Sequence, residues 1–229
     1  MKKKKNVAII QARQGSKRFP KKWTKKISKY LLIEWVVKRT KKSKNLDEIV
    51  IATSKKNADK VFGKIAKKLK VKIYFGDENN VLARFLKAAD KFNADNIIRI
   101  CADNPFISHK FLDDLINFYK KNKCDLAFNH RPNKKMKYKC IDGLGAEIFS
   151  LDVLSSVSKL AKSKDDKEHV TKFLYRNSKK FIIKPVPIDK KFQINKKLDI
   201  DRKSDLKNII KLVKNNKISI NSSDQKIIN

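Results

Sequence analysis

The sequence predicts an α/β protein with one domain built on a doubly wound, mostly parallel β-sheet. Short apolar runs alternate along the chain with amphipathic stretches of helical period. The connections between them are short, with no long linker and no clear repeat. The length of 229 residues and the hydrophobic fraction of 41% suit a single domain with a sizeable core. We place this domain at residues 1–214 and a polar C-terminal tail at residues 215–229.

Six apolar runs are predicted strands. They span residues 7–11, 48–52, 71–75, 96–101, 125–128 and 146–149. Between them, residues 80–92 and 108–121 carry apolar side chains on one helical face, and Ser108 is the expected N-cap of the second helix. A last helix is marked by Leu206, Ile209, Ile210 and Val213. Because helices alternate with strands, the strands are expected to be parallel and to bind ligands beyond their carboxyl ends.

Two segments read as irregular. Residues 129–141 are polar and basic, and we expect a long loop over the site. Residues 215–229 mix Asn, Ser and Lys with a few Ile, which predicts a partly frayed end.

The net charge of +35 comes from 58 Lys and Arg residues against 23 Asp and Glu residues. Only eight of these cations are Arg, the residue that base readout prefers, and no zinc-finger or helix-turn-helix pattern is present. We therefore expect nonspecific polyanion binding at low salt and no specific nucleic-acid partner. Such a charge also attracts anionic nucleotides and sugar acids.

The expected location is cytoplasmic, without a membrane partner. No apolar run approaches the roughly 18 residues that cross a bilayer. The basic start is followed by only four apolar residues, which is too short for a signal core. Cys101, Cys124 and Cys140 show no C-x₂-C spacing, so reduced and mostly buried thiols are expected.

The segment after the first strand, residues 11–22, combines a glycine, a hydroxyl and several cations. Triphosphate recognition needs backbone N–H groups that approach phosphate oxygens, together with fixed positive charge. No G-x₄-G-K-[ST] pattern occurs, so this is not a Walker loop. In so basic a chain, the residues alone leave both a phosphate loop and an ordinary basic loop open. Glycine is scarce, and four of the five glycines (all but Gly63) lie at predicted strand ends.

The run IIQARQGSKRFPKK (9–22) resembles the signature loop of the sugar cytidylyltransferases, which include the acylneuraminate- and 3-deoxy-octulosonate-activating enzymes. FGDENNVLARFLKAA (75–89), RICADNPFIS (99–108) and LDIDRKSDL (198–206) resemble later elements of that family. DGLGAEIFS (142–150) and EHVTKFLYRN (168–177) resemble its spore-coat-polysaccharide branch. The match runs in order from residue 7 to about residue 213. It implies the fold of the nucleotide-diphospho-sugar transferases and a homodimer.

The resemblance implies a role for individual residues. The nucleotide would be bound by Ala12, Arg13, Gly15, Ser16, Lys17, Arg18, Lys22 and Ala102. Arg13, Lys22 and Asp103 would be catalytic. Mg²⁺ would be the cofactor, held by Asp103, Asp199 and Asp201, because a hard cation that bridges phosphates prefers a few carboxylate oxygens. The sugar would be bound by Asp142, Glu147, Glu168 and His169.

Several of these residues also have ordinary structural interpretations. Asp103 is also suited to cap its own loop, and Asp199 or Asp201 to cap the last helix. Asp205 is interpreted as a helix-start carboxylate. Two further pairs stay open at this point. Arg84 and Arg99 contact an anionic group or lie on element surfaces, and Tyr175 and Arg176 are packing or dimer residues.

The chain departs from the family pattern at four places. The family usually has Gly at the positions of Lys21 and Ala102, and its G-K-P element reads here as Ser28-Lys29-Tyr30. In the spore-coat branch, Asp stands where this chain has Gly145, so one sugar contact is missing.

The resemblance implies that CMP passes from CTP to a sugar with release of pyrophosphate, the sugar being a keto acid or another surface-polysaccharide precursor. One alternative is a metal-dependent glycosyltransferase that uses a nucleotide-sugar, since Asp199-Ile200-Asp201 forms a D-x-D motif, although a late one. Another is a nonenzymatic polyanion-binding module.

Overall fold

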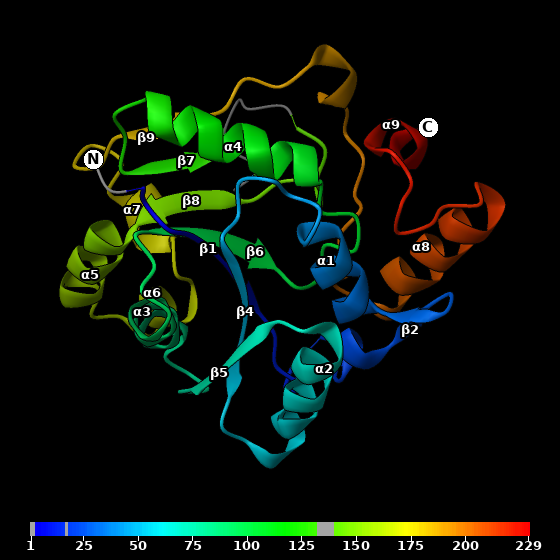
Figure 1. Cartoon of the computed structure of the whole chain (residues 1–229), viewed down its shortest axis with the longest axis horizontal. Helices are drawn as coiled ribbons and strands as arrows, with labels where there is room; N and C mark the ends of the chain where they lie inside the picture. The colour runs from blue at the N-terminus through cyan, green and yellow to red at the C-terminus, as the bar shows by residue number, and fades with distance from the viewer. Residues whose placement is uncertain (1–2, 17, 132–139) are drawn as a thin grey trace.

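The computed structural model describes residues 3–16, 18–131 and 140–229, and its centre is a seven-stranded sheet (Figure 1). The strand order is β5-β4-β1-β6-β8-β7-β9. The strands are β1 (Asn6–Gln11), β4 (Glu48–Ser54), β5 (Lys72–Gly76), β6 (Asn96–Cys101), β7 (Leu126–Phe128), β8 (Glu147–Ser150) and β9 (Ile183–Pro185). All six predicted strands are present, and β9 was not predicted.

The strands are mostly parallel, as predicted. β5, β4, β1 and β6 run parallel to one another, and β9 runs parallel to β7. β8 is antiparallel to both of its neighbours, β6 and β7.

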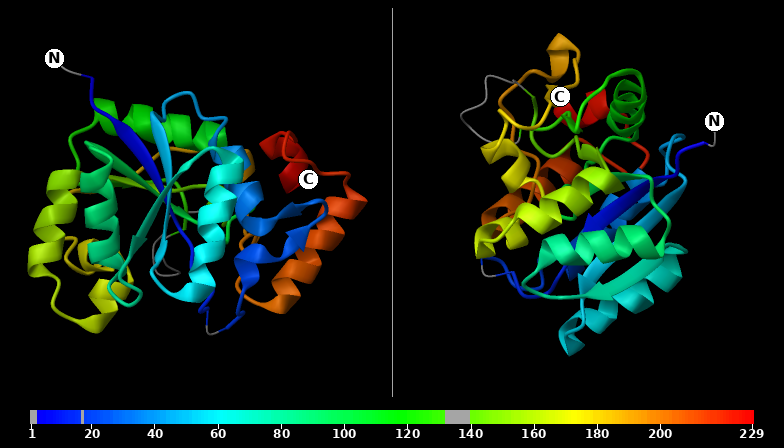
Figure 2. Two further views of the ribbon diagram at one scale, coloured as in Figure 1. Left: turned by 60° about the horizontal axis from the view of Figure 1, so that its bottom comes forward. Right: turned by 90° about the vertical axis from the view of Figure 1, so that its left-hand side faces the viewer.

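Helices cover both faces of the sheet, which makes it doubly wound (Figure 2). One layer contains α1 (Leu32–Thr40), α2 (Val61–Leu69) and α4 (His109–Lys121), and the other contains α3 (Val81–Lys91) and α5 (Leu151–Leu160). Successive strand residues alternate between these layers: Ala8 and Ile10 pack against the first, Val7 and Ile9 against the second. Strands buried on both faces explain why their sequences read as continuous apolar runs.

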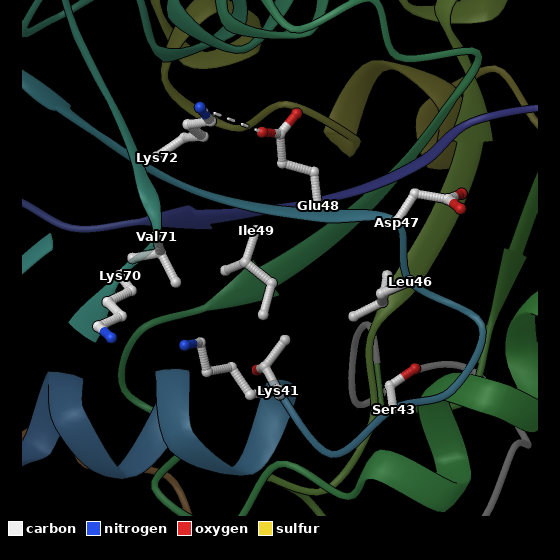
Figure 3. Close-up of a pocket in the computed structure, with 10 residues that line it drawn as sticks. Lys41, Ser43, Leu46, Asp47, Glu48, Ile49, Lys70, Val71 and Lys72 are labelled. Carbon is white, nitrogen blue, oxygen red and sulfur yellow. Dashed lines mark ion pairs between the residues drawn. The ribbon is translucent and has the colours of Figure 1, made fainter. Parts of the chain in front are cut away.

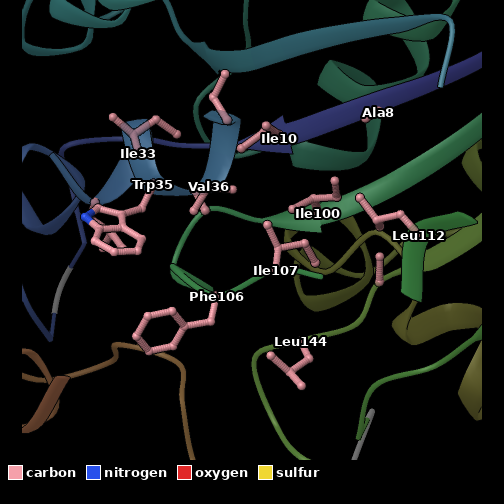
Figure 4. Close-up of a cluster of buried hydrophobic side chains, with 14 of the residues drawn as sticks. Ala8, Ile10, Ile33, Trp35, Val36, Ile100, Phe106, Ile107, Leu112 and Leu144 are labelled. Carbon is pink, nitrogen blue, oxygen red and sulfur yellow. The ribbon is translucent and has the colours of Figure 1, made fainter. Parts of the chain in front are cut away.

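The first of these two cores is anchored by aromatic side chains (Figure 4). Trp35 of α1 meets Phe106 edge to face, with ring centroids 5.8 Å apart. Figure 4 shows Ile10 and Ile100, from β1 and β6, in the same cluster. The core therefore supports the two strands whose carboxyl ends carry the predicted site.

The predicted helix starts are confirmed at two side-chain caps. The Ser108 hydroxyl accepts the N–H of Phe111 at the start of α4. Asn80 accepts the N–H of Ala83 at the start of α3.

Smaller elements complete the chain. They are β2 (Lys26–Ile27), β3 (Tyr30–Leu31), α6 (Lys164–Glu168), α7 (Lys172–Arg176), α8 (Lys203–Asn215), α9 (Asp224–Ile228) and three 3₁₀ turns at Lys22–Thr24, Asn57–Lys60 and Lys190–Phe192. Among the described residues, no helix is long and apolar enough to span a membrane. The expected loop at 129–141 falls largely on residues 132–139, outside the described part.

The C-terminal segment is not a frayed polar tail, and this prediction was wrong. Ile218, Ile220, Ile227 and Ile228 are buried in the first core. Asp224 forms a buried ion pair with Arg39 of α1, at 2.9 Å. The domain therefore extends through α9.

The chain order around β1 creates a natural binding crevice. From β1 the chain passes to β4 and β5 on one side, and then returns to β6 on the other side. In open parallel sheets, ligands bind outside the carboxyl ends of the strands at such a switch point. Here that point lies between β1 and β6.

Candidate active site

A cavity of about 370 Å³ opens at the carboxyl ends of β1 and β6. Eight residues predicted for the site line it: Arg13, Ser16, Arg18, Lys22, Ala102, Asp103, Glu168 and His169. The remaining lining residues are Gln11, Trp23, Arg99 and Cys101. Residues far apart in sequence thus meet at the topological switch, in a cavity large enough for a small ligand.

The loop that follows β1 is held in place by backbone hydrogen bonds and by one buried side chain. Gln14 donates its N–H to the buried carboxylate of Asp59 at 2.6 Å, and its carbonyl accepts the N–H of Lys21 at 3.0 Å. Phe19 is buried in the core, so the loop is pinned at its middle as well. The hydroxyl of Ser16 accepts the N–H of Phe19 at 3.4 Å within the loop.

Two departures from the family's glycines have a backbone consequence. Lys21 has φ 56° and Ser28 has φ 55°, both in the left-handed region that favours glycine. A glycine at either position would adopt this backbone conformation without strain. This chain carries strained non-glycine residues there instead.

Lys22 lies at the centre of the site and is 4% exposed. Its ammonium donates to Asp103 Oδ2 at 2.9 Å and to the carbonyl of Ile200 at 2.7 Å. It also lies 3.7 Å from Asp201 Oδ1. One ammonium therefore joins two of the three carboxylates that were predicted to hold a metal.

Two other cations of the loop, Arg18 and Arg13, are also paired across the cavity. Arg18 Nη2 lies 2.8 Å from Asp201 Oδ1. Arg13 Nη2 lies 2.9 Å from Glu168 Oε1 and so joins the predicted nucleotide side to the predicted sugar side. Lys17 lies outside the described residues.

Other predicted residues lie apart from the cavity lining. Ala12 is fully buried and donates its N–H to the carbonyl of Ala52, so it supports the loop from the core. Gly15 is on the exposed surface of the loop.

Two further carboxylates, Asp142 and Asp199, lie beside this group because their segments pair. Asp142 donates its N–H to the carbonyl of Lys196 and accepts the N–H of Leu198. Gly143 has φ +97°, and a Cβ there would meet the backbone of Leu198 at 2.9 Å. Glycine thus permits the close approach that brings Asp142 and Asp199 together.

Mutual repulsion marks these carboxylates as neighbours. Burial and the nearby Asp142 raise the pKa of Asp199 to about 6, and Asp103 and Asp201 add to the shift. Burial also raises the pKa of Asp142, with a contribution from Asp103. One oxygen of Asp199, Oδ1, is buried without a hydrogen-bond partner within the described structure.

The donor set fits Mg²⁺ as part of a shared site. The described residues contain no group of three or more His, Cys, Asp and Glu that could hold a metal alone. Mg²⁺, however, usually binds one or two carboxylates together with substrate phosphates and waters. Asp103 and Asp201, with the unpartnered oxygen of Asp199 beside them, supply that number of ligands.

The structure does not support the alternative helix-cap role for Asp199 and Asp201. At the start of α8 it is the carboxylate of Asp205 that accepts the N–H groups of Asp201 and Arg202, at 2.9 and 2.8 Å. The interpretation of Asp205 as a helix-start carboxylate is confirmed. Asp201 is therefore free to face the loop cations.

Glu147 has a different position from the one expected. It is 1% exposed, and its carboxylate is fully engaged by Arg99 Nη1 at 2.7 Å, Tyr175 Oη at 2.8 Å and Thr171 Oγ1 at 3.0 Å. Burial alone would raise the pKa of Glu147, but Arg99 and the hydrogen-bonded neighbours hold it well below its usual range. Glu147 was predicted to bind a sugar hydroxyl directly, but its carboxylate is buried and does not line the cavity. It instead holds Arg99, which does line the cavity.

This network also resolves Tyr175, which the sequence left open between packing and dimer contact. Its hydroxyl donates to Glu147 and its ring packs 5.9 Å from that of Phe128. Arg99, likewise left open, is a cavity-lining residue.

Gly145 marks a close backbone approach. A Cβ at this position would lie 2.0 Å from the carbonyl oxygen of Asn129. An aspartate like that of the spore-coat branch does not fit here without movement of the backbone. The close contact with Asn129 therefore explains why this chain has glycine at position 145.

Gln11, Trp23 and Cys101 also line the cavity, and the sequence motifs assigned no role to them. Trp23 follows Lys22, whose ammonium lies 5.1 Å from its ring centroid. Cys101 ends β6, and burial raises the pKa of its thiol to about 12. Cys101 could have been predicted as a site residue because it ends a strand. For Trp23, the sequence offered only its position next to Lys22.

A second cavity, of about 410 Å³, lies at the opposite end of the sheet (Figure 3). It is lined by residues at the amino ends of β4 and β5, among them Glu48, Ile49 and Lys72. Figure 3 shows Lys72 paired with Glu48 across its rim. Parallel sheets bind their ligands at the other end, so the cavity between β1 and β6 is the candidate active site.

Known proteins resemble this chain over most of its length. It is 37% identical over 175 residues to an uncharacterized protein of Methanocaldococcus jannaschii, a match that covers 76% of this chain and 69% of that protein. It is 30% identical over 171 residues to the spore coat polysaccharide biosynthesis protein SpsF of Bacillus subtilis, covering 72% and 68% of the two chains. The structure of a cytidylyltransferase from Leptospira borgpetersenii superposes with a TM-score of 0.90 at 26% identity, covering 99% of this chain and 93% of that one.

The family model described as cytidylyltransferase matches residues 7–227. This span includes the loop after β1, the acidic residues after β6 and before α8, and the C-terminal helix. The chain belongs to the cytidylyltransferase family.

Proposed function

We propose that the protein transfers CMP from CTP to a sugar hydroxyl and releases pyrophosphate. The observation that carries this proposal is the meeting of two loop cations, Lys22 and Arg18, with the carboxylates of Asp103 and Asp201 beside the cavity between β1 and β6. Arg13 lines the same cavity. A triphosphate needs both parts: fixed positive charge for its oxygens, and carboxylates that share a metal with them.

In this reaction the oxygen of a sugar hydroxyl forms a bond to the α-phosphorus of CTP, and the bond from that phosphorus to the pyrophosphate oxygen breaks. The hydroxyl proton is released to water. Arg13, Arg18 and Lys22 bind phosphate oxygens and stabilise the charge that moves onto the leaving pyrophosphate. Asp103 and Asp201 would hold Mg²⁺, which supplies further charge stabilisation on the phosphates. The protein's main contribution is position and electrostatics, as in other phosphoryl transfers.

On the sugar side, Glu168 and His169 line the same cavity, and Asp142 lies beside the acidic group. Carboxylates and an imidazole suit the hydroxyl groups of a sugar. The sugar is proposed to be a keto acid or another surface-polysaccharide precursor, since the relative SpsF is a spore coat polysaccharide biosynthesis protein. The homodimer and the cytoplasmic location stay predictions.

The experiment measures pyrophosphate release from CTP with Mg²⁺ and a panel of keto-acid and neutral sugars. Asp103→Asn is expected to lower the rate by about a hundredfold or more, because removing a group that stabilises transition-state charge has effects of this size. Asp189→Asn is the matched control, since Asp189 is 71% exposed and pairs only with Lys191 in the described structure. No release with any sugar, together with no CTP binding, contradicts the proposal. Transfer from a nucleotide-sugar without pyrophosphate would instead favour the glycosyltransferase alternative.

A further inference from the structure

A buried cation of the chain lies between the proposed metal ligands. The Lys22 ammonium contacts Asp103 Oδ2 at 2.9 Å and lies 3.7 Å from Asp201 Oδ1. Arg18 contacts the same Asp201 oxygen at 2.8 Å. Each carboxylate therefore has a cationic partner from the chain itself.

The position of Lys22 is built into the fold. The Lys22 side chain is 4% exposed, so its ammonium is bound by protein groups and has almost no contact with water. The carbonyl of Ile200 accepts a hydrogen bond from Lys22 at 2.7 Å, and the N–H of Ile200 donates to the carbonyl of Asp103 at 2.9 Å. The segment that carries Asp201 is thus fastened both to the lysine and to the end of β6.

We propose that Lys22, assisted by Arg18, is a stand-in for the metal, and that the two exchange partners when the metal–nucleotide complex binds. This inference rests on the proposed function. In the free protein the lysine keeps the carboxylates together and competes with a divalent cation for them. When a triphosphate arrives, its oxygens offer the lysine and the arginine new anionic partners, and the carboxylates become available.

The exchange has a thermodynamic consequence. A metal alone must displace a buried ammonium from its ion pairs, so it binds weakly. A metal that arrives with a triphosphate does not leave the ammonium unpaired, so nucleotide and metal strengthen each other's binding by the same factor. Removing the ammonium removes the competition and most of this coupling.

The test is Mn²⁺ binding without nucleotide, followed by electron paramagnetic resonance of the free ion. Lys22→Met keeps the apolar stem and deletes the charge, and it is expected to bind Mn²⁺ about tenfold more tightly than the wild type, or more, because a charge-assisted contact is lost. The adjacent Lys21→Met is the matched control, since Lys21 is exposed and forms no ion pair within the described residues. It is expected to bind Mn²⁺ as the wild type does.

Two further variants keep the result decisive. Arg18 is 64% exposed, so Arg18→Met is expected to fold normally and to raise Mn²⁺ affinity less, by up to about fivefold. Adding Asp103→Asn to Lys22→Met is expected to abolish the gain, which locates the ion.

Unchanged or weaker Mn²⁺ binding in both Lys22→Met and Arg18→Met overturns the exchange, and so does a gain that survives Asp103→Asn. If Lys22→Met does not fold, as judged by circular dichroism, unchanged binding in Arg18→Met is sufficient to overturn it. If the Mn²⁺ prediction fails while the wild type still releases pyrophosphate from CTP, the proposed function stands. If the wild type releases no pyrophosphate with any sugar while Lys22→Met still gains Mn²⁺ affinity, the proposed function alone is overturned.

Discussion

Replacing Glu147 with glutamine tests whether the buried network behind the cavity supports it. The Glu147 carboxylate is engaged by Arg99, Tyr175 and Thr171, and His130 Nε2 lies 3.1 Å from it. Glutamine has the same size but no charge, so the Arg99 guanidinium is left buried without its counter-ion.

Breaking a buried ion pair on one side costs about 3–5 kcal/mol, and we expect about 3 kcal/mol because glutamine retains one acceptor. For a chain of this length the melting temperature should fall by roughly 10 °C. The loss should be pH-dependent. The pKa of Glu147 is lowered in the folded protein from an ordinary value of 4.5, so its stabilising effect is complete above that pH and disappears as the pH falls below it.

The assay is urea unfolding of wild type and Glu147→Gln between pH 3 and pH 8. Glu78→Gln serves as the control, because its ion-pair partner Lys56 is 63% exposed and the change should be within about 1 kcal/mol. A Glu147→Gln protein as stable as this control at pH 7 would refute the reasoning. A stability difference that stays constant on acidification would refute it as well.

Three further changes test the backbone and the C-terminal segment. Lys21→Gly should stabilise the fold by about 0.5–1 kcal/mol in urea unfolding, because glycine relieves the left-handed strain at φ 56°; a loss of stability would contradict this. Asp224→Ala should destabilise it by about 3–5 kcal/mol, because Arg39 would remain buried without its partner, whereas a frayed tail requires no change. Gly145→Ala should yield a protein with a strongly lowered melting temperature, since its Cβ would meet the Asn129 carbonyl at 2.0 Å, and a normal melt would show that the approach is not tight.

The central strands were predictable because both of their faces are buried. Each is a continuous apolar run, and its ends are marked by polar or glycine residues, so β1 and β6 agree with the predicted bounds to within one residue. β9 has no such signal, because its three residues lie at the sheet edge, none is buried and one is proline.

The prediction for the C-terminal segment, residues 215–229, was wrong for a different reason. Its Ile residues are diluted by Asn and Ser, so local composition resembles a tail. Its order depends on Arg39, which lies 185 residues before Asp224. No local pattern carries information about such a distant partner.

The candidate site was predictable where position along a strand carried the argument. Arg13, Lys22 and Asp103 follow β1 and β6, and neighbouring parallel strands bring their carboxyl ends together. Glu147 was misplaced because its partner is set by strand register: β8 pairs antiparallel with β6, which places Glu147 opposite Arg99. The sequence motif identifies Glu147, but it does not reveal whether the side chain faces the cavity or a neighbouring strand.

The most direct test of the central claim is thermal stabilisation by CTP, UTP, GTP and ATP, each with Mg²⁺, in wild type and Asp103→Asn. If the protein uses CTP, then CTP should raise the melting temperature most, and Asp103→Asn should lose this CTP-dependent rise. Equal stabilisation by all four nucleotides, or a CTP effect that is unchanged in Asp103→Asn, would contradict it.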